Sequence, residues 1–119
     1  AEEKKRKKKE LTEEEKRYIH EGFENDEQLS MYDLLMKEDL SKEDIKKLKV
    51  VAKDLLEKIK AQLATMDHPF DKQETQASII ITIRDILWEE LPESYSDASI
   101  NYYRDAVYNY ISQRYGTAA

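Results

Sequence analysis

The chain has no cysteine, only two glycines and only two prolines among its 119 residues. Without cysteine it can form neither a disulfide nor a thiolate metal site. Its two glycines, Gly22 and Gly116, are too few for the glycine-rich loops that hold nucleotide phosphates. No apolar run approaches the roughly 20 residues that a membrane span needs. We therefore expect no cofactor, no metal and no membrane contact for this chain.

The composition and pattern of the chain are typical of a helical protein. Of its residues, 39% are charged, and apolar residues recur every three or four positions. We predict an all-α fold, a compact bundle of four or five helices in one domain. Ser41 and Ser96 have the type and position of N-caps, and Gly116 fits a C-terminal cap. The helices are expected near residues 13–24, 27–37, 42–65, 72–91 and 97–115.

The stretch from 71 to 91 is apolar on nearly all sides when it is wound as a helix at about 100° per residue. One side carries Ile79, Ile83 and Ile86, and the opposite side carries a second apolar set: Ala77, Ile80, Ile81, Leu87, Trp88 and Leu91. A helix with two apolar sides is expected to be surrounded by other helices. We predict residues 72–91 as the central buried helix, with Trp88 in the core, where Trp88→Ala would cost about 3–5 kcal/mol.

Arg84 lies within this apolar surface, four residues from Ile80 and four from Trp88. In one interpretation its stem packs on Trp88 while the guanidinium reaches water. In the other it forms a buried or interfacial ion pair, because an unpaired charge there would be costly. The sequence leaves both interpretations open.

The net charge of −6 is unevenly distributed, since residues 1–60 carry −1 and residues 61–119 carry −5. The first half also contains a lysine stripe, which falls within about 60° on the flank of the third helix. Such a stripe could follow a phosphate backbone, or it could be ordinary solvated helix surface. Its members, the candidates for DNA contact, are Lys42, Lys46, Lys49, Lys53 and Lys60.

Six consecutive cations, Lys4 to Lys9, stand near the start of the chain. Such runs are usually solvated linkers, although a contact with nucleic acid is the alternative. We predict a charged linker or helical extension over residues 1–12 and a single helical domain over 13–116. Because the first residue is alanine and dense charge follows at once, we expect a piece excised from a longer protein.

Tyrosines gather in the last helix, beside an arginine. Exposed tyrosine and arginine are typical of interface hot spots, which would make this surface a docking site. The alternative is a tyrosine-rich edge of the core with its hydroxyls in water. The candidates for partner docking are Tyr102, Arg104, Tyr108 and Tyr115.

Catalytic patterns are missing. His20 and Glu24 are spaced four residues apart, as two ligands on one helix face would be, but they lack a third metal ligand. No pairing of a nucleophile with a base is recognisable. We expect no catalytic residue in this chain.

Several segments between Gly22 and Tyr115 resemble the extreme C-terminus of the motor subunits of type I restriction enzymes. The most distinctive is a Leu-Pro-x-x-Tyr junction between two helices. The segments are Met31–Leu35, Asp67–Ala77, Leu87–Tyr95, Val107-Tyr108, Ile111 and Arg114-Tyr115.

The resemblance implies a cytoplasmic parent, an ATP-driven DNA translocase and endonuclease (a hydrolase) that uses ATP and magnesium. In that family the terminal helical domain is associated with docking the motor onto a methyltransferase core of specificity and modification subunits. No motor or nuclease motif occurs in this chain, so no catalytic residue is carried over. Two functions remain: a docking module for complex assembly, or an auxiliary module that binds double-stranded DNA through its lysines.

Overall fold

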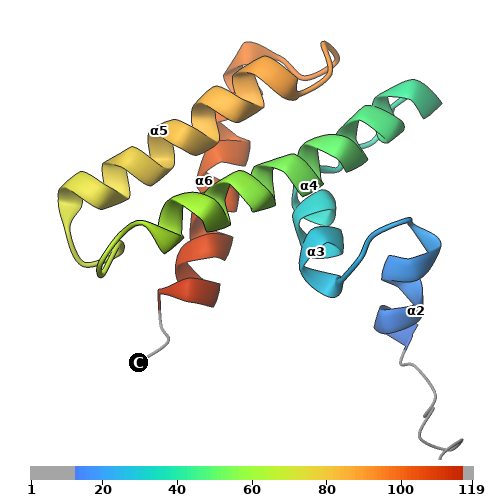
Figure 1. Cartoon of the computed structure of the whole chain (residues 1–119). Helices are drawn as coiled ribbons and strands as arrows, with labels where there is room; N and C mark the ends of the chain where they lie inside the picture. The colour runs from blue at the N-terminus through green and yellow to red at the C-terminus, as the bar shows by residue number, and fades with distance from the viewer. Residues whose placement is uncertain (1–12, 117–119) are drawn as a thin grey trace, which may run out of the picture.

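The structure is a computed structural model that describes residues 13–116, with side chains from Arg17 onward (Figure 1). Within these residues it is all-helical, which confirms the predicted fold class. The linker predicted over residues 1–12, with Lys4 to Lys9, lies outside the described residues. The five helices are α2 (Glu13–His20), α3 (Asp26–Leu35), α4 (Lys42–Ala64), α5 (Gln73–Glu90) and α6 (Asp97–Tyr115).

The helices begin and end where local chemistry directs. Ser41 and Ser96 accept hydrogen bonds from the N–H groups of Asp44 (3.0 Å) and Ser99 (3.2 Å), so both predicted N-caps are confirmed. The first helix ends at His20, earlier than predicted, because Gly22 takes a φ of +89° that only glycine adopts without strain. The Phe23 N–H then bonds the carbonyl of Tyr18 at 2.9 Å, which closes a Schellman motif.

Four helices form a closed ring in which each packs against two others of the ring. α4 packs on α3 and α5, and α6 packs on the same two, whereas α2 lies at the edge and packs on α3 alone (Figure 1). The Cα atoms extend 17 Å along the shortest axis of the molecule. Since packed helix axes lie about 8–10 Å apart, this thickness holds two layers of helices. No helix between residues 13 and 116 can therefore be covered on every side.

The prediction that α5 is buried on all sides is wrong. Its buried residues are Ile79, Ile83, Ile86 and Leu87, whereas Trp88 is 60% exposed. Trp88 follows Ile79 by nine residues, which at about 100° each places it on the opposite side of the helix. Of the second apolar set, Leu87 is buried with the isoleucine side, whereas Ala77, Ile81 and Trp88 stay exposed.

The core runs around the inside of the ring. α4 has the stripe that its spacing predicts, with Leu48, Leu55 and Ile59 fully buried. α6 buries Ile100 and Val107 as its spacing predicts. The core also takes Tyr95, from the loop between α5 and α6. Within the described residues, no helix has the length and hydropathy to cross a membrane.

Candidate functional site

The lysine stripe of α4 is largely paired within the chain. The ammonium of Lys49 lies 3.0 Å from a carboxylate oxygen of Glu21, and that of Lys60 lies 2.9 Å from Glu27. Lys53 lies over the ring of Phe23, 5.5 Å from its centroid. Lys42 and Lys46 are exposed and have no ion-pair partner within residues 17–116. Only the first two turns of α4 thus present free cations.

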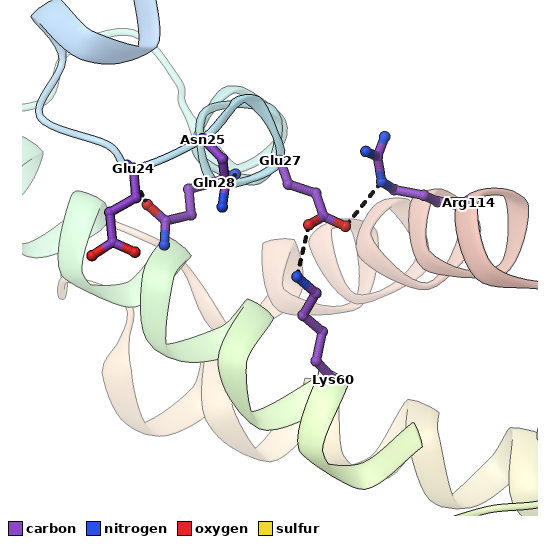
Figure 2. A network of polar contacts seen from close by, with 6 residues as sticks. All are labelled: Glu24, Asn25, Glu27, Gln28, Lys60 and Arg114. Carbon is purple, nitrogen blue, oxygen red and sulfur yellow. Dashed lines mark hydrogen bonds and ion pairs between the residues drawn. The ribbon is translucent and has the colours of Figure 1, made fainter. Parts of the chain in front are cut away.

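Glu27, which the sequence analysis did not single out, is the centre of this pairing (Figure 2). Its side chain is buried, with 8% of the residue exposed, yet it carries two partners from other helices. Oε1 accepts a hydrogen bond from Lys60 of α4, and Oε2 accepts one from the Nε of Arg114 of α6, both at 2.9 Å. The carboxylate also lies in the first turn of α3, where the helix dipole favours negative charge. We call this group the Glu27 clamp, because it ties three helices together.

Beside the Glu27 clamp lies a polar hollow of about 370 Å³, lined in part by Glu24, Asn25, Gln28 and Lys53. Several of its polar groups already bond one another. The Asn25 side chain accepts from the N–H of Gln28 at 2.9 Å, and the Gln28 side chain accepts from the N–H of Glu24 at 2.8 Å (Figure 2). The side-chain oxygens of Asn25 and Gln28 are therefore engaged by the turn that begins α3. Glu24 also lies beyond the end of α2, so it does not share a helix face with His20.

The four docking candidates of α6 do not form one free surface. Tyr102 is 68% exposed, with its ring edge-on to that of Tyr103. Arg104 is engaged on its own helix, because it donates to Asp105 and Asn101 and lies 2.9 Å from the Asp105 carboxylate.

The other two candidates are half-buried. The ring of Tyr108 packs on Phe70 with 6.0 Å between centroids, and burial raises the pKa of its hydroxyl. Tyr115 buries its hydroxyl, which has no hydrogen-bond partner within the described residues. Of the four docking candidates, only Tyr102 is exposed in the way that an interface hot-spot residue would be.

The largest exposed aromatic side chain lies instead on α5. We call the side formed by Ala77, Ile81, Arg84 and Trp88 the outer face of α5. Ile81 is 48% exposed and Trp88 is 60% exposed. Arg84 is exposed between them and lies 3.3 Å from the carboxylate of its neighbour Asp85. A buried ion pair is therefore wrong for Arg84, because its guanidinium is exposed; the packing of its stem on Trp88 and an ion pair at an interface stay predictions.

A hollow of about 250 Å³ opens beside Trp88, at the junction between α5 and α6. We call it the Trp88 hollow. Glu93 and Asp97 contribute two exposed carboxylates to its wall, and the other lining side chains are apolar or aromatic: Leu87, Leu91, Pro92, Tyr95 and Ile100.

Tyr95 anchors the segment between α5 and α6. This residue is buried, and its hydroxyl donates a hydrogen bond to the carbonyl of Leu35 at the end of α3. Burial raises the pKa of Tyr95 far above that of an ordinary tyrosine. Lys37 adds to the anchor, since its ammonium donates to the Ser94 carbonyl at 2.6 Å and lies over the Tyr95 ring. The Leu-Pro-x-x-Tyr junction thus has a structural role that periodicity could not reveal.

Searches against family models, curated proteins and solved structures found no match to this chain. Within residues 13–116 no cluster of three or more histidine or acidic side chains could hold a metal ion. The outer face of α5 with the Trp88 hollow is the candidate site that the geometry favours. Periodicity places Ile81 and Trp88 on one side of the helix, but it does not show that this side is uncovered.

Proposed function

We propose that this chain is a non-catalytic docking module of a type I restriction enzyme motor subunit. In this proposal it attaches a cytoplasmic, ATP-dependent DNA translocase and endonuclease to the methyltransferase core of specificity and modification subunits. The sequence resemblance between Gly22 and Tyr115 supports the family. The exposure of Trp88 on the outer face of α5 is the observation that carries the docking role.

The spacing of the outer face suits a partner helix. Ala77, Ile81, Arg84 and Trp88 follow one another by four, three and four residues, which is the seam spacing of helices that pack side by side. Exposed apolar side chains that form such a seam are typical of interaction surfaces. Tryptophan and arginine are also enriched among hot spots, so this seam has the residue types that interfaces use.

The charge around Trp88 favours a basic partner surface. Residues 84–97 contain five carboxylates and one cation, Arg84. Complementary charge speeds the encounter of two proteins and suppresses wrong partners. It would also keep this end of the module away from DNA, because carboxylates repel a phosphate backbone.

The decisive variant is Trp88→Ala in the full-length motor subunit, tested by co-purification with the methyltransferase core. Because Trp88 is 60% exposed, the free energy of unfolding should change by less than about 1 kcal/mol. Association should weaken by about 2 kcal/mol, the effect of losing an interface hot spot. ATPase activity should persist, because this chain holds none of the motor motifs.

Val50→Ala is the matched control, since Val50 is equally exposed (64%) but lies on α4. It should leave assembly unchanged. Tyr102→Ala serves as the competing variant, because Tyr102 stays a docking candidate on α6. Assembly lost with Tyr102→Ala and kept with Trp88→Ala would move the docking surface from α5 to α6.

A second candidate function is contact with double-stranded DNA, and the free cations Lys42 and Lys46 favour it. Replacing both with glutamine should then weaken binding on all sequences alike. The slope of log affinity against log salt should shrink by about 0.9 for each phosphate that the variant no longer neutralises. Lys49→Gln is the control, because Glu21 already occupies that cation. An unchanged slope for the Lys42/Lys46 variant would reject this function.

A further inference from the structure

The Trp88 hollow has the dimensions and chemistry of a subsite for one long side chain. Its volume of about 250 Å³ lies below the 300–1,000 Å³ usual for pockets that bind whole small molecules. Its lining combines apolar and aromatic side chains with the carboxylates of Glu93 and Asp97, and polar atoms make the larger part of its exposed wall. An occupant that satisfies both parts needs an apolar stem and a positively charged end.

The acidic groups of the hollow are unoccupied by the chain's own cations. Within residues 17–116, neither Glu93 nor Asp97 forms an ion pair. The nearby cations are engaged elsewhere. Arg84 pairs with Asp85, Lys58 pairs with Asp54 and Glu90, and Lys37 bonds the carbonyl of Ser94.

The indole of Trp88 adds a third element. Tryptophan is the best aromatic partner for a cation held over its ring, and at 60% exposure its indole can be reached from solvent. A guanidinium is planar and stacks on aromatic rings, and its fork of N–H groups matches a carboxylate in a bidentate pair. An ammonium offers neither the plane nor the fork, so the hollow fits arginine better than lysine.

The anchored junction makes the hollow a preformed one. Tyr95 lines it and is tied through its hydroxyl to the carbonyl of Leu35. The backbone of Ser94 is held by Lys37, and its hydroxyl donates to the carboxylate of Asp44 at 3.0 Å. These bonds connect the loop to α3 and α4, so little ordering remains to be done when a side chain enters. Preorganisation of this kind lowers the entropic cost of binding.

We propose that the Trp88 hollow receives one arginine side chain from the basic surface of the docking partner. The guanidinium stacks on Trp88 and pairs with Glu93 or Asp97, while its methylene stem packs on Leu91 and Pro92. This inference rests on the proposed docking function and names the chemistry that the partner must supply at this site.

The test uses the full chain and a short acetylated peptide that carries one arginine among alanines. Its readout is the indole N–H resonance of Trp88, the single tryptophan of the chain. We expect a saturable shift with the arginine peptide. Binding should be about tenfold weaker for the matched peptide in which neutral citrulline replaces arginine, because the charge-assisted bonds are then absent. Equal binding of the two peptides, or no saturable shift with arginine, would overturn the subsite.

Variants of the two rim carboxylates, Glu93 and Asp97 at the edge of the hollow, complete the test. Glu93→Gln and Asp97→Asn, made together, should reduce affinity for the arginine peptide about tenfold and leave the citrulline peptide unaffected. Glu89→Gln is the matched control, because Glu89 is an exposed carboxylate of α5 that does not line the hollow. A thermal melt of each variant shows that the fold is kept. An equal loss for the rim and control variants would reduce the effect to net charge and contradict the proposal.

The outcome for the hollow is separable from that for docking. If Trp88→Ala abolishes assembly while the arginine peptide does not bind, the docking function stands and the arginine subsite falls. If the peptide binds while Trp88→Ala assembles normally, the hollow takes arginine but the docking surface lies elsewhere.

Discussion

At Lys49 and Lys60 of the lysine stripe, charges are paired within the chain, whereas beside Trp88 the carboxylates of Glu93 and Asp97 face outward. Lys49 and Lys60 lie about 3 Å from carboxylates that other segments supply. Glu93 and Asp97 are exposed and, within residues 17–116, have no cationic partner. The difference has a simple cause. The α2–α3 segment packs beside Lys49, Lys53 and Lys60, whereas within residues 13–116 no helix covers the Trp88 side of α5.

The comparison shows why a charged surface cannot be assigned a partner from its charge alone. A lysine that already neutralises a carboxylate of its own chain releases no counterion when DNA binds, so it adds little to salt-dependent affinity. A carboxylate without a partner, beside an exposed tryptophan, retains its attraction for a cation. Lys49 and Lys60 of the stripe therefore support the fold, and the end of α5 keeps carboxylates that can attract a cation.

The largest expected loss of stability comes from disrupting the Glu27 clamp, where charges are paired within the chain. Glu27→Ala leaves Lys60 and Arg114 without their shared carboxylate and removes an acidic group from the first turn of α3. Loss of one partner of a buried pair costs about 3–5 kcal/mol. Because both cations are about half-exposed, we expect about 2 kcal/mol here. Urea unfolding measures it, with Glu24→Ala as the control. Equal losses for the two variants would show that the Glu27 clamp adds nothing.

A somewhat smaller loss of stability is expected when the anchor of the junction between α5 and α6 is removed. Tyr95→Phe leaves the carbonyl of Leu35 without its buried donor, which should lower the free energy of unfolding by about 1–2 kcal/mol. Tyr102→Phe, at an exposed position, is the control and should change it by no more than a few tenths. If the two variants are equally stable, the junction is not anchored through this hydroxyl.

Alkaline pH tests the same anchor. Because burial raises the pKa of Tyr95 above the ordinary 10.0, the unfolded chain releases this proton first as the pH rises. Folding stability from this group is thus complete below pH 10.0 and declines above it. The Tyr95→Phe variant should lose less stability than the wild-type chain above that pH. Parallel stability curves for the two proteins would contradict the assignment.

The two ends of the lysine stripe should also differ in stability. Lys60→Gln removes a cation from the Glu27 clamp and should cost about 1 kcal/mol after discounting for its partial exposure. Lys42→Gln lies at the free end and should change stability by no more than a few tenths of a kcal/mol. Denaturant midpoints of the two variants are sufficient to compare them. Equal midpoints would remove the distinction between paired and free lysines.

The smallest expected change in stability concerns Glu90, a carboxylate at the end of α5 that is partly buried. Burial and then the neighbouring Asp54 raise the pKa of Glu90, whereas the hydrogen bond from Glu90 lowers that of Asp54. Ionised Glu90 is therefore disfavoured in the folded state at neutral pH. Glu90→Gln keeps a hydrogen-bond donor for Asp54 and should stabilise the fold by a few tenths of a kcal/mol at pH 7.

Low pH should remove the gain in stability of Glu90→Gln. As the pH falls through the raised pKa toward the ordinary 4.5, the wild-type Glu90 takes up its proton and the two proteins converge. Thermal melts at neutral and acidic pH measure the difference. A loss of stability in Glu90→Gln at pH 7 would show that the attraction between Glu90 and Lys58 outweighs burial.

The helices, and much of where they end, follow from local sequence. Period-3.6 spacing, serine caps and the glycine after α2 act within a few residues, so they can be recognised without knowledge of the fold. The same local rules account for the buried stripes of α4 and α6, because each of those helices has one clear apolar side.

Which side of α5 is covered, and which charges are paired, depends instead on how the helices pack. Periodicity defines the two apolar sides of this helix, but the number and placement of its neighbours choose between them. In a ring of four helices, α5 receives two neighbours on the Ile79 side, and Trp88 stays outside. Likewise the Glu27 clamp joins residues 33 and 87 positions apart along the chain. Contacts across such distances form only when the helices assemble, and no local pattern contains that information.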